Sequence, residues 1–184
     1  MRLRRKLQRL IDFSQDYFAL FGLPRRYRFD PEQLDRSYRA LQHKIHPDRF
    51  ATGEEAQRRL ALQSSARVNE AYRALRDPVG RAQYLLSLRG IDALSETNTA
   101  LAPAFLEHEL ERRESVADAQ DRRDPARLDE LLREVRNDAH ALESTLANRL
   151  EREAWDEARD AVRELKFLAK VGDDIEAALA EVEG

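Results

Sequence analysis

The chain has 184 residues, of which 42% are apolar and 36% are charged, so it can bury the core of one large domain or of two small ones. It contains no cysteine, which excludes disulfides and thiolate metal sites, and it has no apolar run of about eighteen residues, the length that a membrane-spanning helix needs. The net charge of −3 hides a division, because residues 1–100 carry 19 basic and 12 acidic side chains whereas residues 101–184 carry 13 and 23. Two halves of opposite sign predict two surfaces with different partners.

The first thirteen residues form a separate basic segment. Five arginine or lysine side chains surround Leu3, Leu7 and Leu10, and Asp12 is the only acid. The segment is arginine-rich like a transit peptide, but it has no serine and no signal-peptide apolar core. We interpret residues 1–13 as an N-terminal extension, with a targeting peptide as the alternative.

Two helices are predicted on either side of a short polar loop. Asp30 followed by Pro31 is a helix-start signal, because an acceptor side chain at the N-cap precedes a proline in the first turn. The apolar positions that follow recur at offsets 0, 4, 7 and 11, the spacing of one helix face, and they are Leu34, Tyr38, Leu41 and Ile45. The second helix is predicted over residues 54–76, with an apolar face made of Leu60, Ala61, Ser64, Val68, Ala71, Tyr72 and Leu75. A short helix over residues 16–21 is predicted to close the base of this pair.

The loop between these helices contains the tripeptide His46-Pro47-Asp48. Pro47 lacks an amide hydrogen and disfavours α geometry at His46, so the first helix is expected to end near Ile45. The two antiparallel helices then form a finger whose tip presents His46 and Asp48. Basic side chains are expected on one face of this finger, and they are Arg36, Arg39, His43, Lys44 and Arg49. Because proline and aspartate are common turn formers, a plain turn is the alternative to a docking loop.

An all-α fold is predicted for the whole chain, because long periodic stretches contain only six glycines and six prolines. Asp77 and Pro78 predict one further helix after the finger, and Gly90 predicts its end. Three bundle helices are expected at about 103–120, 125–150 and 152–182, with Gly172 bending or interrupting the last. Three helices joined by short loops, each with one apolar face, pack as an antiparallel three-helix bundle. The predicted parts are therefore the extension 1–13, a finger domain 14–90, a linker 91–102 and a bundle 103–184.

The finger with His46-Pro47-Asp48 at its tip resembles a J domain, the module that stimulates ATP hydrolysis by DnaK-class chaperones. Three further stretches, residues 16–24, 81–90 and 155–170, resemble the HscB family, the J-type co-chaperones of iron–sulfur cluster assembly. The tripeptide lies between the first two at the family's spacing. The resemblance covers residues 16 to about 180.

This resemblance implies two protein partners. The first is the DnaK-class chaperone HscA, to which the tip and the basic face of the finger would bind. The second is the scaffold protein IscU, for which the family uses a bundle patch that matches Leu106, Leu110, Glu111, Glu114, Asp118 and Phe167 in this chain. Glu107 departs from the pattern, since relatives can have an apolar residue there, so the patch is expected to be smaller and more acidic. Burial of Leu106, Leu110 and Phe167 in the bundle core is the alternative.

No catalytic or metal-binding constellation is apparent, and the implied mechanism is allosteric, without chemistry by this chain. His108 and His140 lie on separate predicted helices without a partner motif, and a glycine-rich phosphate loop is absent. We therefore expect no enzyme activity, cofactor or metal, no nucleic-acid or membrane partner, and a bacterial cytoplasmic monomer, with weak self-association as the alternative.

Two other functions stay open. One is a general folding co-chaperone whose bundle binds unfolded or membrane-associated clients or only mediates dimers, although zinc modules and a Gly/Phe-rich segment are missing. The other is a nucleic-acid binder that uses the basic half, although acidic residues are interleaved with the basic ones.

Overall fold

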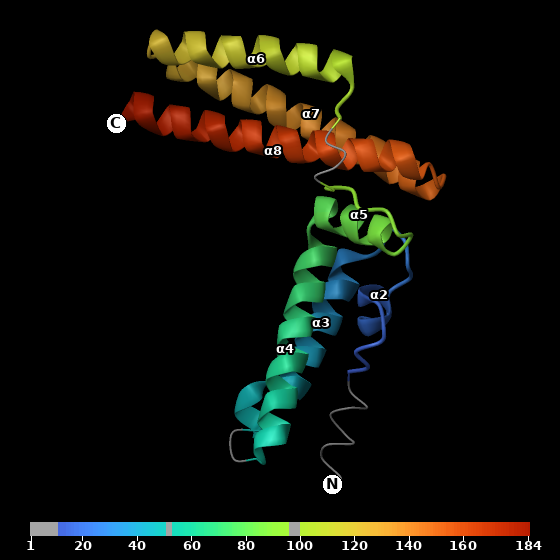
Figure 1. Cartoon of the computed structure of the whole chain (residues 1–184). Helices are drawn as coiled ribbons and strands as arrows, with labels where there is room; N and C mark the ends of the chain where they lie inside the picture. Colours follow the sequence, from blue (N-terminus) through green and yellow to red (C-terminus); the bar gives the residue numbers. More distant parts are fainter. Residues whose placement is uncertain (1–10, 51–52, 96–99) are drawn as a thin grey trace. The chain divides into compact units, whose positions relative to one another are not determined.

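A computed structural model describes residues 11–50, 53–95 and 100–184, and every regular element in these ranges is helical, as predicted (Figure 1). The chain divides into two compact units, Met1–Leu85 and Leu86–Gly184. Most of the predicted extension and the middle of the predicted linker lie outside the described residues.

The first unit is built around a helical hairpin. Its elements in chain order are α2 (Tyr17–Leu20), α3 (Pro31–Ile45), the 3-10 turn η1 (Pro47–Phe50), α4 (Glu55–Arg76) and α5 (Pro78–Ser87), which crosses the boundary between the units. Helices α3 and α4 lie side by side and antiparallel, and η1 joins them at the tip (Figure 1). This is the predicted finger.

The hairpin forms for the reasons that the sequence indicates. The Asp30 carboxylate accepts a hydrogen bond from the Glu32 backbone N–H at 2.9 Å, so α3 begins with a side-chain cap and a proline in its first turn. Leu34 and Ile45 are buried at its two ends. On the facing side of α4, five of the seven predicted residues are buried, namely Ala61, Ser64, Val68, Ala71 and Leu75. Leu60 and Tyr72 are partly buried. Apolar burial along both helices stabilises the finger and fixes the direction of its tip.

Aromatic rings join the helices of this unit. Tyr38 of α3 stacks on Tyr72 of α4 with ring centroids 3.9 Å apart, and the Tyr72 hydroxyl donates to Asp35 at 2.8 Å. At the base, Tyr17 of α2 stacks on Tyr84 of α5 at 4.1 Å, and the Tyr17 backbone N–H donates to the Tyr84 hydroxyl at 2.9 Å. These contacts connect segments far apart in the sequence.

Tyr17 makes the stability of this unit sensitive to alkaline pH. The pKa of Tyr17 is raised to about 12, mainly by burial and secondly by the hydrogen bond to the Glu70 carboxylate. In an unfolded chain the pKa of tyrosine is about 10. A group whose pKa is raised by folding stabilises the fold fully below its unfolded pKa, and this contribution is lost as the pH rises through the folded pKa. We expect the unfolding free energy to fall between about pH 10 and 12, and to fall less steeply in Tyr17→Phe. Urea titrations followed by circular dichroism across this range test the prediction, and equal slopes for the two proteins would contradict it.

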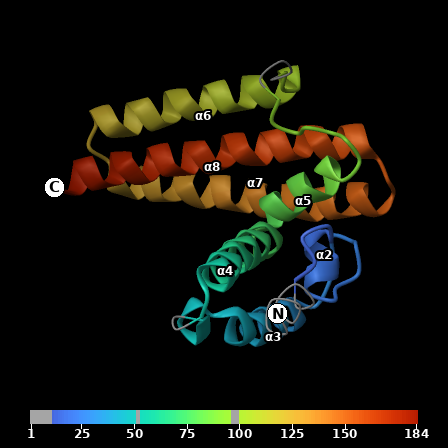
Figure 2. The ribbon, with the colours of Figure 1, turned by 60° about the horizontal axis from the view of Figure 1, so that its bottom comes forward.

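The second unit is the predicted antiparallel three-helix bundle, with α6 (Pro103–Asp121), α7 (Pro125–Glu151) and α8 (Trp155–Glu183). Helices α7 and α8 run along each other for most of their length, and α6 lies alongside them (Figure 2). Asp124 caps α7 by accepting from the Arg127 backbone N–H at 3.0 Å. One core cluster joins all three helices, and its buried members are Ala119, Leu128, Leu131, Leu132, Val135, Leu168, Ile175 and Ala178.

Two predictions for the last helix are wrong. Helix α8 is not interrupted at Gly172, and it begins at Trp155 instead of Arg152. The turn before it places Glu153 in the left-handed region with φ 57°, and the Ala154 backbone N–H donates to the Arg149 carbonyl at 2.9 Å. Glycine is the usual residue in such a turn, so glutamate at this position gave no signal that the chain breaks here.

Gly172→Ala is expected to stabilise the bundle. A methyl group at this position would lie 3.9 Å from the Leu132 Cδ1 and the Val135 Cγ1, which is ordinary contact, and alanine favours a helix interior by about 0.5–1 kcal/mol over glycine. Gly90→Ala is the matched control with the opposite sign, because Gly90 has φ +78° and ends the α5 turn. Thermal unfolding followed by the fluorescence of Trp155, the single tryptophan, measures both changes. A lowered midpoint for Gly172→Ala would refute the prediction.

Candidate protein-docking surfaces

The tip of the finger is held in place by a buried residue on each side. Ile45 ends α3 with no exposed surface, and Phe50 ends η1 with 8% exposed. His46 lies between the two helical segments in an extended conformation, with ψ 129°, as expected for a residue before proline. The side chains of His46 and Asp48 are exposed by 54% and 88%. The structure therefore presents both to solvent from an anchored loop.

Hydrogen bonds within the loop orient its polar groups. The Asp48 backbone N–H donates to His46 Nδ1 at 3.3 Å, and the same Nδ1 lies 3.5 Å from Asp48 Oδ2. The Arg49 backbone N–H donates to the His46 carbonyl at 3.0 Å, and Arg49 Nη1 donates to the His43 carbonyl in the last turn of α3 at 2.9 Å. The loop thus presents the His46 imidazole and the Asp48 carboxylate side by side at the tip.

The predicted basic face is only partly available to a partner. Arg36 Nη1 lies 3.1 Å from Glu32 and its Nη2 lies 3.1 Å from Asp30, so its charge is largely compensated. Arg39 and Lys44 are exposed and form no ion pair within the described part of the chain. These two, with the exposed His43 beside them, are the residues of α3 best placed to attract an acidic surface.

A second candidate surface lies on α6. Leu106 and Leu110 are exposed by 45% and 59%, so the alternative that they belong to the bundle core is wrong. The acidic residues of the predicted patch are exposed as well, and they are Glu111, Glu114 and Asp118, together with Glu107. Asp118 is 3.8 Å from Arg122. Two adjacent exposed leucines beside several carboxylates form a small apolar patch with an acidic border.

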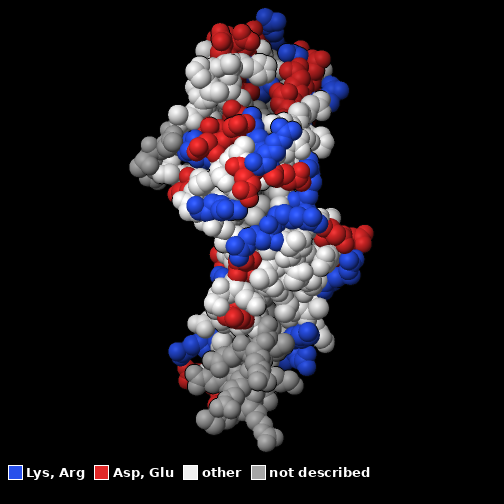
Figure 3. All heavy atoms as spheres, turned by 90° about the vertical axis from the view of Figure 1, so that its right-hand side faces the viewer, with Lys and Arg blue, Asp and Glu red and all other residues white. Residues whose placement is uncertain are grey.

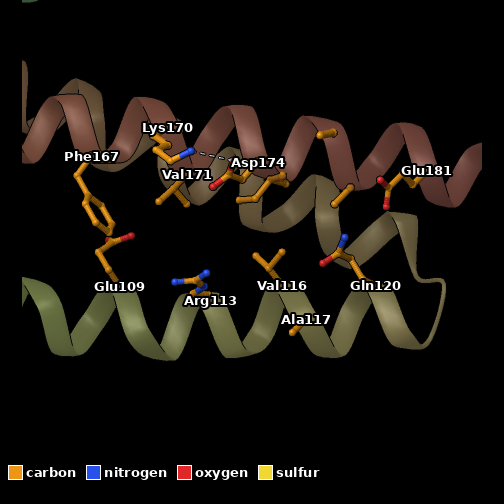
Figure 4. A pocket seen from close by; sticks show the side chains of 13 residues that line it. Glu109, Arg113, Val116, Ala117, Gln120, Phe167, Lys170, Val171, Asp174 and Glu181 are labelled. Atoms are coloured by element: carbon orange, nitrogen blue, oxygen red, sulfur yellow. Dashed lines mark ion pairs between the residues drawn. The ribbon is translucent and has the colours of Figure 1, made fainter.

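Phe167 of α8 is half-buried, so it is neither a full core residue nor a fully exposed one. Its ring lies edge-on to Phe105 of α6 with centroids 5.6 Å apart and an interplanar angle of 80°. It also lines a groove between α6 and α8, and Figure 4 shows it pointing from α8 toward Glu109. The structure therefore brings Phe167 to the same side of the bundle as α6.

Sequence reasoning missed a buried ion cluster on α6. Glu109 and Arg112 have side chains only 3% exposed and are paired at 2.5 Å, and Arg112 also pairs with Asp138 of α7. Arg112 Nη2 lies 3.0 Å from His108 Nε2. The spacing of three residues between Glu109 and Arg112 was visible in the sequence, but charged residues are rarely this buried and no local signal indicated it.

Charges of both signs are interleaved on the face of the bundle that Figure 3 shows. In the upper part of Figure 3 acidic and basic atoms alternate, and no large patch of a single sign appears on that face. Among the described residues, no group of three or more His, Cys, Asp or Glu side chains is placed to hold a metal ion. Within the same residues, no helix has the length and apolar character needed to cross a bilayer.

The hairpin, its tip and the separate bundle define the class of protein. Residues 16–84 match the DnaJ domain family, and residues 101–176 match the family described as the HSCB C-terminal oligomerisation domain. A chain with this pair of domains is a J-domain co-chaperone.

Comparison with individual proteins identifies the family. A co-chaperone protein HscB homolog of Burkholderia multivorans is 44% identical over 95% of this chain and 99% of its own length. A co-chaperone protein HscB homolog of Cupriavidus taiwanensis is 46% identical over 92% of this chain and 97% of its own length. Among solved structures, chaperone HscB from Vibrio cholerae has a TM-score of 0.80 at 37% identity over 91% of this chain and 99% of its own. Human co-chaperone protein HscB has a TM-score of 0.84 at 26% identity, over 91% of this chain and 83% of its own. The chain belongs to the HscB family, as predicted.

Proposed function

We propose that this chain serves iron–sulfur cluster assembly by delivering the scaffold protein IscU to the DnaK-class chaperone HscA and by stimulating the ATPase of HscA. The observation that carries the proposal is the exposure of His46 and Asp48 at the end of an anchored helical finger. The proposed parts are a J domain at 14–90, a linker at 91–102 and a scaffold-binding bundle at 103–184, with residues 1–13 as an extension, in a bacterial cytoplasmic protein.

The tip would dock the chaperone through two polar groups. The Asp48 carboxylate is exposed and accepts a charge-assisted hydrogen bond from an arginine of the partner, and the His46 ring makes a second polar contact. Pro47 lacks the amide hydrogen that a further turn of α3 would use, so α3 ends before the tip. Arg39, His43 and Lys44 raise the rate of association with an acidic surface, an effect that weakens as salt is added. Arg36 and Arg49 contribute less, because their guanidinium groups already have partners on this chain.

The mechanism is allosteric. Docking favours the hydrolysis-competent state of the chaperone only if the J domain binds that state more tightly than the other. Delivered scaffold protein shifts the same equilibrium further. The chain then needs no catalytic group of its own, and it acts as a regulator of its partner's ATPase.

The scaffold protein would bind the α6 surface. Leu106 and Leu110 supply the exposed apolar contact, Phe167 extends it toward α8, and Glu111, Glu114 and Asp118 form the acidic border. This arrangement suits a partner whose apolar strip is flanked by lysine or arginine residues.

Steady-state ATP hydrolysis by HscA of the same organism tests the proposal, with this protein and IscU added singly and together. We expect each to stimulate weakly and the pair to act synergistically. Stimulation that IscU does not change would favour a general folding co-chaperone. No stimulation in any combination would refute the proposal.

A further inference from the structure

The bundle contains a groove that the proposed scaffold-binding surface touches only at Phe167. It lies between α6 and α8, has a volume of about 470 Å³, and includes aliphatic side chains such as Val116, Val171 and Ile175 in its lining (Figure 4). Phe167 lies at one end of it. The groove therefore continues the α6 surface that carries Leu106 and Leu110.

A buried carboxylate lies at the Phe167 end of the groove. Glu109 is 3% exposed, and its Oε1 accepts from Arg112 Nη1 at 2.5 Å. Its other oxygen, Oε2, is buried and has no hydrogen-bond partner within the described residues. Figure 4 shows Glu109 pointing from α6 toward the Phe167 ring on α8. An acceptor that is both charged and buried without a donor is costly.

The charge balance of this cluster favours a cation over a neutral donor. Glu109 and Asp138 share the single guanidinium of Arg112, and His108 Nε2 lies 3.9 Å from Asp138 Oδ2. With a neutral His108 the four side chains have a formal charge of −1. A ligand amide would satisfy the hydrogen bond of Glu109 Oε2, whereas an ammonium or guanidinium group would satisfy the bond and the charge. Charge-assisted bonds are also the stronger ones.

Within the described residues, no lysine or arginine of this chain donates to Glu109 Oε2. Lys170 Nζ lies 3.5 Å from Asp174, farther along the groove. Arg113 is exposed at the groove and forms no ion pair in the ranges that the structure describes. It is the internal competitor for Glu109, because residues four apart on a helix are neighbours.

We propose that this groove receives a lysine or arginine side chain of the scaffold protein, whose charged group binds Glu109 Oε2 beside the Phe167 ring. The proposal rests on the proposed function and deepens it. The aliphatic stem of such a side chain covers apolar surface while its head stays polar, and an aromatic ring attracts a cation. Because Oε2 is covered in the unbound chain, the half-buried Phe167 side chain turns aside when the cation enters.

A double-mutant cycle with IscU of the same organism tests this contact. Each lysine and arginine of IscU is replaced by glutamine in turn, and its affinity is measured by calorimetry against the full-length wild-type chain and against Glu109→Gln. We expect one IscU residue whose replacement weakens binding to the wild type about tenfold and weakens binding to Glu109→Gln little. Asp129→Asn, which removes an exposed carboxylate of α7, is the matched control and should retain the full tenfold effect. Equal losses in wild type and Glu109→Gln for every IscU residue would overturn the proposal.

Two further variants test the groove without changing Glu109, and thermal unfolding of each checks that the bundle stays folded. Val171→Phe fills the groove without altering the ion cluster and should also weaken IscU binding, whereas unchanged affinity would count against the groove. Arg113→Gln removes the internal competitor and should leave affinity unchanged or higher. Loss of affinity in Arg113→Gln would indicate an anionic ligand and would overturn the proposal.

The outcomes also separate this proposal from the proposed function. If Leu106→Ala weakens IscU binding while every cycle is additive, the groove proposal fails and the proposed function stands. If neither Leu106→Ala nor Leu110→Ala has an effect, the proposed scaffold surface itself is wrong. Self-association of the chain alone that Glu109→Gln removes, measured by sedimentation, would assign the groove to a second copy and overturn the scaffold as its occupant.

Discussion

His46→Gln and Asp48→Asn are each expected to abolish stimulation of the HscA ATPase while leaving IscU binding intact. Asp48→Asn removes the charge that an arginine of the chaperone would pair with, and such charge-assisted contacts cost about 2–5 kcal/mol when one partner is truncated in an interface. His46→Gln removes the ring that the Asp48 backbone N–H donates to at 3.3 Å, so it changes both the polar group at the tip and the order of the loop. Steady-state hydrolysis rates with and without IscU measure the effect.

Arginine variants on α3 provide the control for charge alone. Arg36→Gln should have little effect, because Glu32 and Asp30 already compensate this side chain at 3.1 Å. Arg39→Gln removes an exposed charge of the same helix and should slow association, with a smaller effect at high salt. If Arg36→Gln were as damaging as Asp48→Asn, docking would depend on the net charge of the finger and not on its tip.

Leu106→Ala and Leu110→Ala are expected to weaken IscU binding by about 1–2 kcal/mol each, which is about five- to thirtyfold. Both side chains are exposed, so their truncation leaves no cavity in the bundle and should not lower its stability. Basal stimulation of HscA in the absence of IscU should persist. Calorimetric titration with IscU and thermal unfolding of each variant measure the two quantities.

Leu94→Ala is the matched control for this pair, because Leu94 is an exposed leucine of the same unit, at 47%, outside the patch. It should leave IscU affinity unchanged. Equal losses for Leu94→Ala and Leu110→Ala would show that general hydrophobicity, and not the α6 surface, governs binding. A loss of ATPase stimulation without IscU in Leu106→Ala would contradict the separation of the two surfaces.

Most of the fold could be predicted because its signals are local. Asp30 and Pro31 begin α3, Pro47 ends it, and Asp124 caps α7 by a bond that spans three residues. Helix periodicity then gives the buried face of each helix without knowledge of its neighbours. The turn at Glu153 could not be predicted, because its left-handed residue is not a glycine.

The sequence by itself determined the all-helical class, the finger and the position of its tip, because caps, prolines and periodicity act within a few residues of each other. Only the tertiary structure decided which side chains of α6 face solvent. Leu106 and Leu110 are exposed while Glu109 and Arg112 are buried, the reverse of what their polarity predicts. The physical reason is that burial on α6 is set by where α7 and α8 approach it, and there Asp138 supplies the partner that makes a buried Arg112 tolerable.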